Sequence, residues 1–297
     1  MASRELIEGI ANQKWIETSA EPLQKAVREL FAGDAGRELK NFLHGVWLGH
    51  PLHPVLTDVP VGAWTAALAL DAFEGISGRK ECGAAADFAI GVGLVGAVGS
   101  AVTGITDWSE TDGSARKVAM LHGLLNLAAA GLYTTALIMR KQKGSRQSGV
   151  AMSMLGYAVA ATSAYLGGHL VFGQQIGVDH TATADTNKPE KYTRVMPEAD
   201  LKEEKPTRVL ADGVAIVLVR RDKNIYALTE TCPHLGGPLS EGKLVGDAIQ
   251  CPWHMSELAL EDGHVVNGPT TYPARCFDVR IRGGYIEVRA QRSASSA

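Results

Sequence analysis

The chain has 297 residues, a formal net charge of −3 and only four cysteines. Its length permits two domains, its near-neutral charge provides no basic footprint for nucleic acid, and its few scattered cysteines are not a disulfide framework. Hydrophobic residues make up 45% of the chain, but most of the long apolar runs come before residue 180. We therefore expect a membrane part followed by a water-facing part.

Residues 1–50 are charged and lack the basic start and apolar core of a secretory signal peptide. Two stretches, 21–31 and 38–47, carry apolar residues at helical spacing, which predicts amphipathic helices. The second helix could lie on a membrane surface with Trp47 at the level of the headgroups, or it could pack as an ordinary helix. Residues 1–50 are therefore predicted to be a soluble, helical N-terminal region.

Four apolar segments follow, at about 54–72, 88–106, 118–139 and 150–172. A membrane-spanning helix needs roughly 20 predominantly apolar residues, so we predict a four-helix transmembrane domain over 51–175 in a lipid bilayer. A soluble all-helical core is the alternative. His53 precedes a proline, which predicts an extended backbone at the mouth of the first span.

The charges of the loops predict the orientation of this domain. The first loop carries Arg79 and Lys80, and the third carries Arg140, Lys141, Lys143 and Arg146. Because basic residues are enriched in cytoplasmic loops, we expect an integral, multi-pass protein with both termini on the non-cytoplasmic side.

Residues 176–192 are polar and indicate a linker. Beyond the linker the pattern changes to short strands separated by turn residues, predicted at 215–220, 225–229, 248–250, 277–281 and 285–288. This pattern predicts a small all-β module over 193–290 and a disordered tail over 291–297. The fold class is therefore α + β with two domains, a four-helix transmembrane bundle followed by the all-β module.

The β module contains two short motifs that hold potential metal ligands. Cys232 and His234 are one residue apart, and Cys251 and His254 are two residues apart. Thiolates suit iron–sulfur clusters and imidazoles suit several transition metals. A zinc site also takes four such ligands, but zinc modules begin with Cys-x2–4-Cys rather than Cys-x-His.

Cys232-Pro-His-Leu-Gly-Gly-Pro-Leu and Cys251-Pro-Trp-His resemble the two cluster-binding loops of the Rieske iron–sulfur family, and the likeness extends over about 193–290. The resemblance implies a [2Fe–2S] cluster in which Cys232 and Cys251 hold one iron and His234 and His254 hold the other.

Two departures from the family pattern concern the potential of the cluster. Where family members often have Gly and an aromatic residue, this chain has Met255 and Leu258. The extra loop cysteines of the high-potential respiratory type are replaced by Gly237 and Trp253. Fewer groups then stabilise the reduced cluster, so we expect a lower potential, nearer the ferredoxin type.

The membrane part resembles a four-span family over about 44–175, through the signature Leu48-Gly49-His50-Pro51-Leu52-His53-Pro54. That resemblance brings no established activity. His53, His122, His169 and Asp58 are expected near one face of the membrane, and ionisable residues inside a membrane indicate function. They could ligate a haem b, bind a quinone or relay its protons, or serve only as structural hydrogen-bonding groups.

These features together predict a membrane-anchored Rieske protein that transfers one electron at a time as a component of an oxidoreductase system. The electron could pass between the [2Fe–2S] cluster and a haem in the membrane domain, or to a redox partner protein or a quinone. The alternatives are a quinone-reactive membrane oxidoreductase and an anchored redox sensor. No catalytic residue is predicted, because the sequence contains no nucleophile elbow and no dinucleotide fingerprint.

Overall fold

The computed structural model describes residues 2–182 and 188–291. These form two compact units, one of Met1–Leu43 with Pro51–Ile176 and the other of His44–His50 with Gly177–Ala297. The predicted domain boundaries at 50/51 and 192/193 stay predictions. Most of the predicted tail (292–297) and the centre of the predicted linker (183–187) lie outside the described residues.

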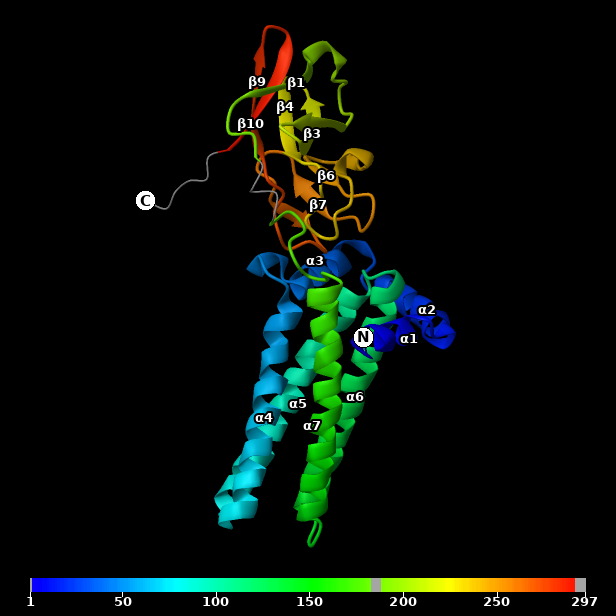
Figure 1. Cartoon of the computed structure of the whole chain (residues 1–297), viewed down its shortest axis with the longest axis vertical. Coiled ribbons are helices and arrows are strands. Elements are labelled where there is room, and N and C mark those ends of the chain that lie inside the picture. Colours follow the sequence, from blue (N-terminus) through cyan, green and yellow to red (C-terminus); the bar gives the residue numbers. More distant parts are fainter. Residues whose placement is uncertain (1, 183–187, 292–297) are drawn as a thin grey trace, which may run out of the picture. The chain divides into compact units, whose positions relative to one another are not determined.

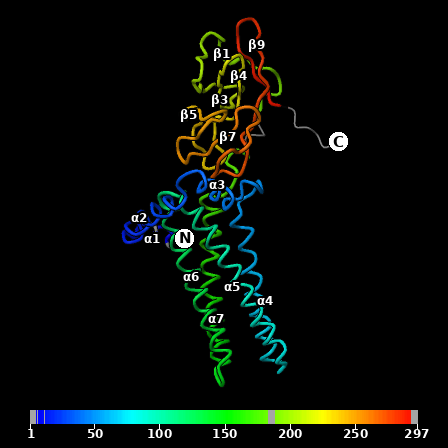
Figure 2. Tube along the Cα trace, turned by 180° about the vertical axis from the view of Figure 1, so that it is seen from behind, coloured from blue at the N-terminus to red at the C-terminus, as the bar shows by residue number. Residues whose placement is uncertain are grey.

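The first unit is helical, with seven α-helices in the described part of the chain. Four of them are long and apolar enough to cross a membrane, which confirms the predicted four-helix transmembrane architecture, and they run side by side in Figures 1 and 2. The helices are α1 (Ala2–Ala11), α2 (Lys14–Leu30), α3 (Gly33–His44), α4 (Leu52–Ser77), α5 (Lys80–Trp108), α6 (Gly113–Lys141) and α7 (Arg146–Gly168), and a π-helical turn, η2 (His169–Gly173), follows α7.

The membrane helices extend beyond the predicted apolar segments because they include charged residues at their ends. The expectation of an extended backbone at His53 is wrong, since His53 is the second residue of α4. Pro54 falls in the first turn of that helix, where a backbone N–H has no intrahelical partner and its loss costs little.

The helices α1 and α2 pack beside α6. Ile7, Ile10 and Ile16 are buried against Val118 and Leu166, so burial of the apolar stripe holds these helices to the bundle. α1 was not predicted. Along α3, Leu39 and Phe42 are more than half exposed, at 52% and 54%, and contact of this face with a membrane surface stays a prediction.

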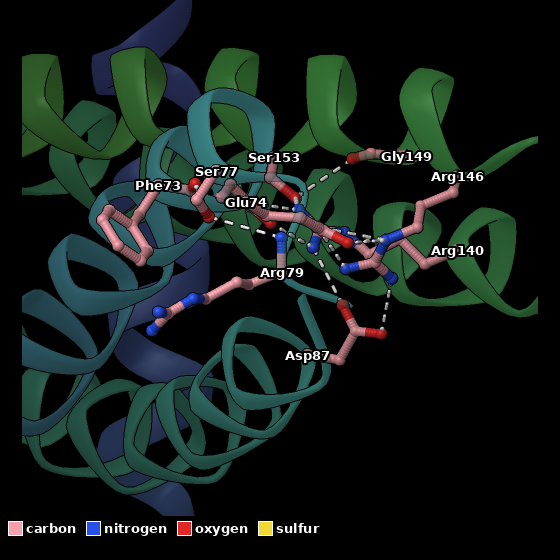
Figure 3. A network of polar contacts seen from close by, with 10 residues as sticks. Phe73, Glu74, Ser77, Arg79, Asp87, Arg140, Arg146, Gly149 and Ser153 are labelled. Atoms are coloured by element: carbon pink, nitrogen blue, oxygen red, sulfur yellow. Dashed lines mark hydrogen bonds and ion pairs between the residues drawn. The ribbon is translucent and has the colours of Figure 1, made fainter. Parts of the chain in front are cut away.

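A buried ion-pair network ties the other end of the bundle together (Figure 3). Arg140 of α6, whose side chain is fully buried, pairs with Asp71 of α4 and with Asp87 of α5. Arg146 of α7 pairs with Asp87 and with Glu74 of α4. All four membrane helices therefore contribute a charge, and each buried charge has the partner that its desolvation requires.

The described residues of the second unit form ten strands in three antiparallel sheets, ordered β1-β10-β9, β2-β3-β4 and β5-β6-β7-β8. All five predicted strands are present. The strands are β1 (Thr193–Pro197), β2 (Thr207–Ala211), β3 (Val214–Arg221), β4 (Asn224–Thr229), β5 (Lys243–Val245), β6 (Ala248–Gln250), β7 (Glu257–Ala259), β8 (Val265–Asn267), β9 (Phe277–Arg282) and β10 (Tyr285–Ala290).

Two apolar cores hold the sheets together, and one of them supports the metal motifs. Leu228, Ile249 and Leu258 are fully buried in that core, together with Cys232 and Cys251. Burying each of these aliphatic side chains contributes about 1.5–3 kcal/mol. The two cysteines are therefore fixed by the same packing that stabilises the module.

Candidate metal centre

Two loops with the same hydrogen-bonding pattern carry the predicted ligands. In the first, the N–H of Cys232 donates to the carbonyl oxygen of Gly237 at 2.8 Å, and the N–H of Gly236 donates to that of Cys232 at 3.0 Å. In the second, the N–H of Cys251 donates to the carbonyl oxygen of Ser256 at 2.8 Å, and the N–H of Met255 donates to the carbonyl oxygen of Cys251 at 3.2 Å. Each cysteine thus begins a closed turn, with its histidine inside the turn.

The two turns differ at the residue that reverses the chain. Gly236 has φ = +81° and Met255 has φ = +61°. Glycine adopts positive φ without steric cost, whereas a side chain there is disfavoured. The second loop therefore carries backbone strain where the first does not.

The turns bring all four predicted ligands together. Cys232 and Cys251 are 0% and 2% exposed, whereas His234 and His254 are half-buried. The two imidazole rings lie 4.8 Å apart between centroids at an interplanar angle of 82°. Thiols inside and imidazoles toward the surface give a site with a buried side and an accessible side.

Hydrogen bonds to the thiols favour the thiolate form that metal binding requires. The Cys232 thiol donates to Cys251, and with the backbone N–H groups of Trp253 and His254 it lowers the pKa of Cys251 to about 6. The pKa of Cys232 is raised, because it supplies the shared proton and because it is buried. The two thiols are therefore close enough to hydrogen-bond each other.

Two thiols and two imidazoles are the donor types of a histidine-ligated binuclear iron–sulfur cluster. A [2Fe–2S] cluster with two Cys on one iron and two His on the other needs only two protein ligands at each metal.

Two contacts beside the predicted ligands, made by Ser256 and Gly237, were not predicted from the sequence. The Ser256 hydroxyl hydrogen-bonds the Cys232 sulfur and accepts the N–H of Thr270 at 3.2 Å. A β-carbon at Gly237 would lie 2.8 Å from the Cys251 sulfur and 3.1 Å from Trp253, so only glycine fits there. The position of Ser256, two residues after His254, could have indicated that its hydroxyl lies near the proposed ligands. The contact between Gly237 and Cys251 has no such indication in the sequence.

The membrane residues predicted to form a second site are only partly brought together. The rings of His53 and His122 lie 6.5 Å apart between centroids, at an interplanar angle of 88°. His169 lies in η2 with its ring against Gly173, and Asp58 is exposed. The structure thus pairs His122 with His53.

Comparison with known proteins agrees with the class that the fold and the loops define, an iron–sulfur electron-transfer module. The profile of the Rieske [2Fe-2S] domain matches residues 191–278. Ferredoxin CarAc of Metapseudomonas resinovorans is 31% identical over 102 residues, which cover 34% of this chain and 95% of that protein. The chain belongs to the Rieske [2Fe–2S] family.

A further relative and a solved structure match a similar share of this chain. The ferredoxin subunit of 3-phenylpropionate/cinnamic acid dioxygenase of Escherichia coli is 33% identical over 91 residues, 30% of this chain and 85% of that protein. Among solved structures, the ferredoxin of carbazole 1,9a-dioxygenase from Nocardioides aromaticivorans is 28% identical and covers 34% of this chain and 100% of its own, with a TM-score of 0.33.

The membrane part matches a different family profile, described as Predicted membrane protein (DUF2231), over residues 49–180. Together with the four apolar helices, this supports an integral membrane protein. The chain therefore joins a Rieske module, whose chemistry is iron–sulfur electron transfer, to a membrane domain.

Proposed function

We propose that the protein is a membrane-anchored electron carrier whose [2Fe–2S] cluster is held by Cys232 and Cys251 on one iron and by His234 and His254 on the other. The observation that carries this proposal is the pair of like turns, which present two buried thiols and two half-buried imidazoles to one another. When bound, such a cluster supplies reversible one-electron chemistry.

The difference in exposure between the ligands supports a direction for electron exchange. His234 and His254 are half-buried while both cysteines are buried, so the histidine side is the face that a redox partner protein reaches. Several relatives, among them CarAc and the subunit from Escherichia coli, are ferredoxins or ferredoxin subunits, which favours a protein partner within an oxidoreductase system.

The surroundings of the cluster favour a ferredoxin-like potential. All four cysteines are free, so no disulfide joins the two loops, and Leu258 is a fully buried core residue that offers no hydroxyl. Known Rieske centres span about −150 to +300 mV, and we expect this one near the lower end. A midpoint near the upper end would contradict the proposal.

Electron paramagnetic resonance of the dithionite-reduced, detergent-purified full chain tests the ligand assignment. The expected spectrum is that of a histidine-ligated [2Fe–2S] cluster, and Cys232→Ser should abolish it. Cys276→Ser is the matched control, because Cys276 lies in the same module outside the two turns and should leave the signal unchanged. Retention of the signal in Cys232→Ser, or its absence from the parent protein, would contradict the assignment.

We further propose that the Rieske module lies on the non-cytoplasmic side. The basic residues Arg79, Lys80, Lys141 and Lys143 near two of the loops support this orientation. Protease treatment of sealed, right-side-out vesicles should digest the module; protection of the module would overturn the orientation.

A second candidate function concerns His53 and His122, which we propose hold a haem or a quinone that exchanges electrons with the cluster. The 6.5 Å separation of His53 and His122 favours this candidate, because redox cofactors in helical bundles are held by side chains from facing helices. Reduction of the cluster by quinol in the purified protein would favour quinone, and a Soret band would favour haem.

A further inference from the structure

The two halves of the membrane domain carry the same sequence pattern. The pattern His-x8-Gly-x2-Thr-x-Ala-Leu begins at His53 in α4 and again at His122 in α6. The pattern Gly-x3-Ala-x2-Ser-Ala-x2-Gly begins at Gly93 in α5 and again at Gly156 in α7. Both patterns recur in the same order, which identifies α4–α5 and α6–α7 as two copies of one helical hairpin.

The two copies hold their histidines by the same contacts. The Nδ1 atom of His53 lies 2.9 Å from the carbonyl oxygen of Ser100, and that of His122 lies 2.8 Å from the carbonyl oxygen of Ser163. Ser100 and Ser163 occupy matching positions of the second pattern. A carbonyl oxygen only accepts, so Nδ1 donates in both rings, and in a neutral ring Nε2 then holds the lone pair.

Glycines at matching positions make room for both rings. A β-carbon at Gly104 would lie 2.7 Å from the His53 ring, and one at Gly167 would lie 3.0 Å from the His122 ring. Both distances are shorter than ordinary van der Waals contact, so each hairpin keeps its histidine in a fixed place against its own second helix.

Equivalent residues of the two hairpins meet one another at three levels. His53 faces His122, the Trp64 and Tyr133 rings stack at 4.2 Å, and Asp71 forms an ion pair with Arg140. Equivalent positions of two copies touch only near a local two-fold axis, which here runs along the helices because α4 and α6 point the same way.

The three contacts differ in whether the two equivalent residues are alike or unlike. At two levels the residues are unlike and complementary, an indole on a phenol and a carboxylate on a guanidinium. Only the pair of His53 and His122 joins two identical residues, and both rings contact a carbonyl oxygen through Nδ1. Two identical donors on a two-fold axis suit a ligand that is bound equally from both sides.

We propose that His53 and His122 are the two axial ligands of a haem iron bound on this axis. The inference rests on the second candidate function and decides between its ligand classes. Imidazoles bound in trans to one metal at about 2 Å each have ring centroids roughly 6–6.5 Å apart, which agrees with the observed 6.5 Å. Donation of the other ring nitrogen to a backbone carbonyl is typical of metal-ligating histidine.

The absence of a third donor favours haem over a bare ion. Within the described ranges, no further His, Cys, Asp or Glu joins the pair to make a group of three. A haem supplies four in-plane nitrogens itself and needs only two axial ligands. The Nε2 atom of His122 accepts a hydrogen bond from Asn126 at 3.1 Å, and this side-chain contact would have to give way to the iron.

Titration of the detergent-purified full chain with haemin tests the proposal. We expect saturation at one haem per chain with the optical and paramagnetic spectra of low-spin, bis-imidazole iron. His53→Gln and His122→Gln should each weaken binding about tenfold or more and lose the low-spin spectrum. His169→Gln should retain both, because His169 has no counterpart in the other hairpin.

The cluster signal, measured in the same samples, shows that each variant is folded and separates the two proposals. A chain with an intact cluster that binds no haemin overturns the haem site alone. A low-spin spectrum that survives in His53→Gln and His122→Gln, or that is lost in His169→Gln, also overturns it. A parent chain that binds haemin but shows no cluster signal would instead count against the proposed cluster ligands.

Discussion

Replacing Met255 by glycine should stabilise the Rieske module. Met255 occupies the same place in its turn as Gly236 does in the other, with φ = +61° against +81°. A side chain in this region costs about 1–2 kcal/mol, while glycine adds about 0.4–1 kcal/mol of unfolded-state entropy. The side chain of Met255 is 52% exposed, so little packing is lost, and the net gain is about 0.5–1 kcal/mol.

The assay follows the visible absorbance of the cluster during heating of the full chain in detergent, because that absorbance reports on this module alone. For a module of about 100 residues, the expected gain raises the midpoint by about 2–8 °C. Met255→Ala is the matched control, since it removes the same side-chain atoms beyond the β-carbon but keeps the disfavoured backbone. The reasoning is refuted if alanine stabilises as much as glycine, or if glycine lowers the midpoint.

The first turn offers the reciprocal experiment. A β-carbon at Gly236 would meet nothing closer than Thr231 at 3.9 Å, so Gly236→Ala adds backbone strain without a clash. We expect a loss of about 1–2 kcal/mol, visible as a lower midpoint in the same assay. An unchanged midpoint would mean that the turn tolerates a side chain and that the strain assigned to Met255 is absent.

Three further changes have defined outcomes. Ser256→Ala removes a hydrogen bond to the sulfur of the proposed ligand Cys232. If that bond favours the reduced cluster by about 1 kcal/mol, the midpoint potential measured in a redox titration should fall by about 40–45 mV. An unchanged potential would contradict the role of the hydroxyl. Burial raises the pKa of the Cys276 thiol from 9.0 to about 11. Alkylation of Cys276 at pH 8, measured by mass spectrometry of its peptide, should therefore be about 100-fold slower than that of an ordinary thiol, and its rate should rise with pH up to about pH 11. Equal rates would refute the shift. Asp71→Asn removes a carboxylate partner of the buried Arg140 and should lower the free energy of unfolding of the membrane domain by about 3 kcal/mol, measured by thermal unfolding. Asp87→Asn should lower it less, because the Asp87 side chain is 29% exposed whereas that of Asp71 is 3% exposed.

The sequence was sufficient to identify the Rieske motif because the residues of that motif are local. Cys232 and His234 sit in one short turn and Cys251 and His254 in another, so their spacing carries the chemistry. It was not sufficient to predict β1 or β2, because a strand such as β1 is defined by its pairing with β10, almost a hundred residues away. Three-residue strands such as β5 and β7 give little sign of a period of two, although β6, which has the same length, was predicted.

The membrane histidines were a harder problem, because depth in a membrane does not fix rotation about a helix. His122 and His169 were both expected near one face, and only helix packing decides that His122 meets His53. The signal that could have identified the pair was in the sequence, in the repeat of one pattern at His53 and at His122. A search for internal similarity would have found it.

Both parts of this chain hold their candidate ligands where two like pieces of backbone face each other. In the β module the two turns share their backbone hydrogen bonds, and the position with positive φ is Gly236 in one and Met255 in the other. In the membrane domain Asp71 and Arg140 have become unlike because an ion pair needs opposite charges. The two histidines are alike, and two identical donors that face each other are what the proposed haem ligation requires.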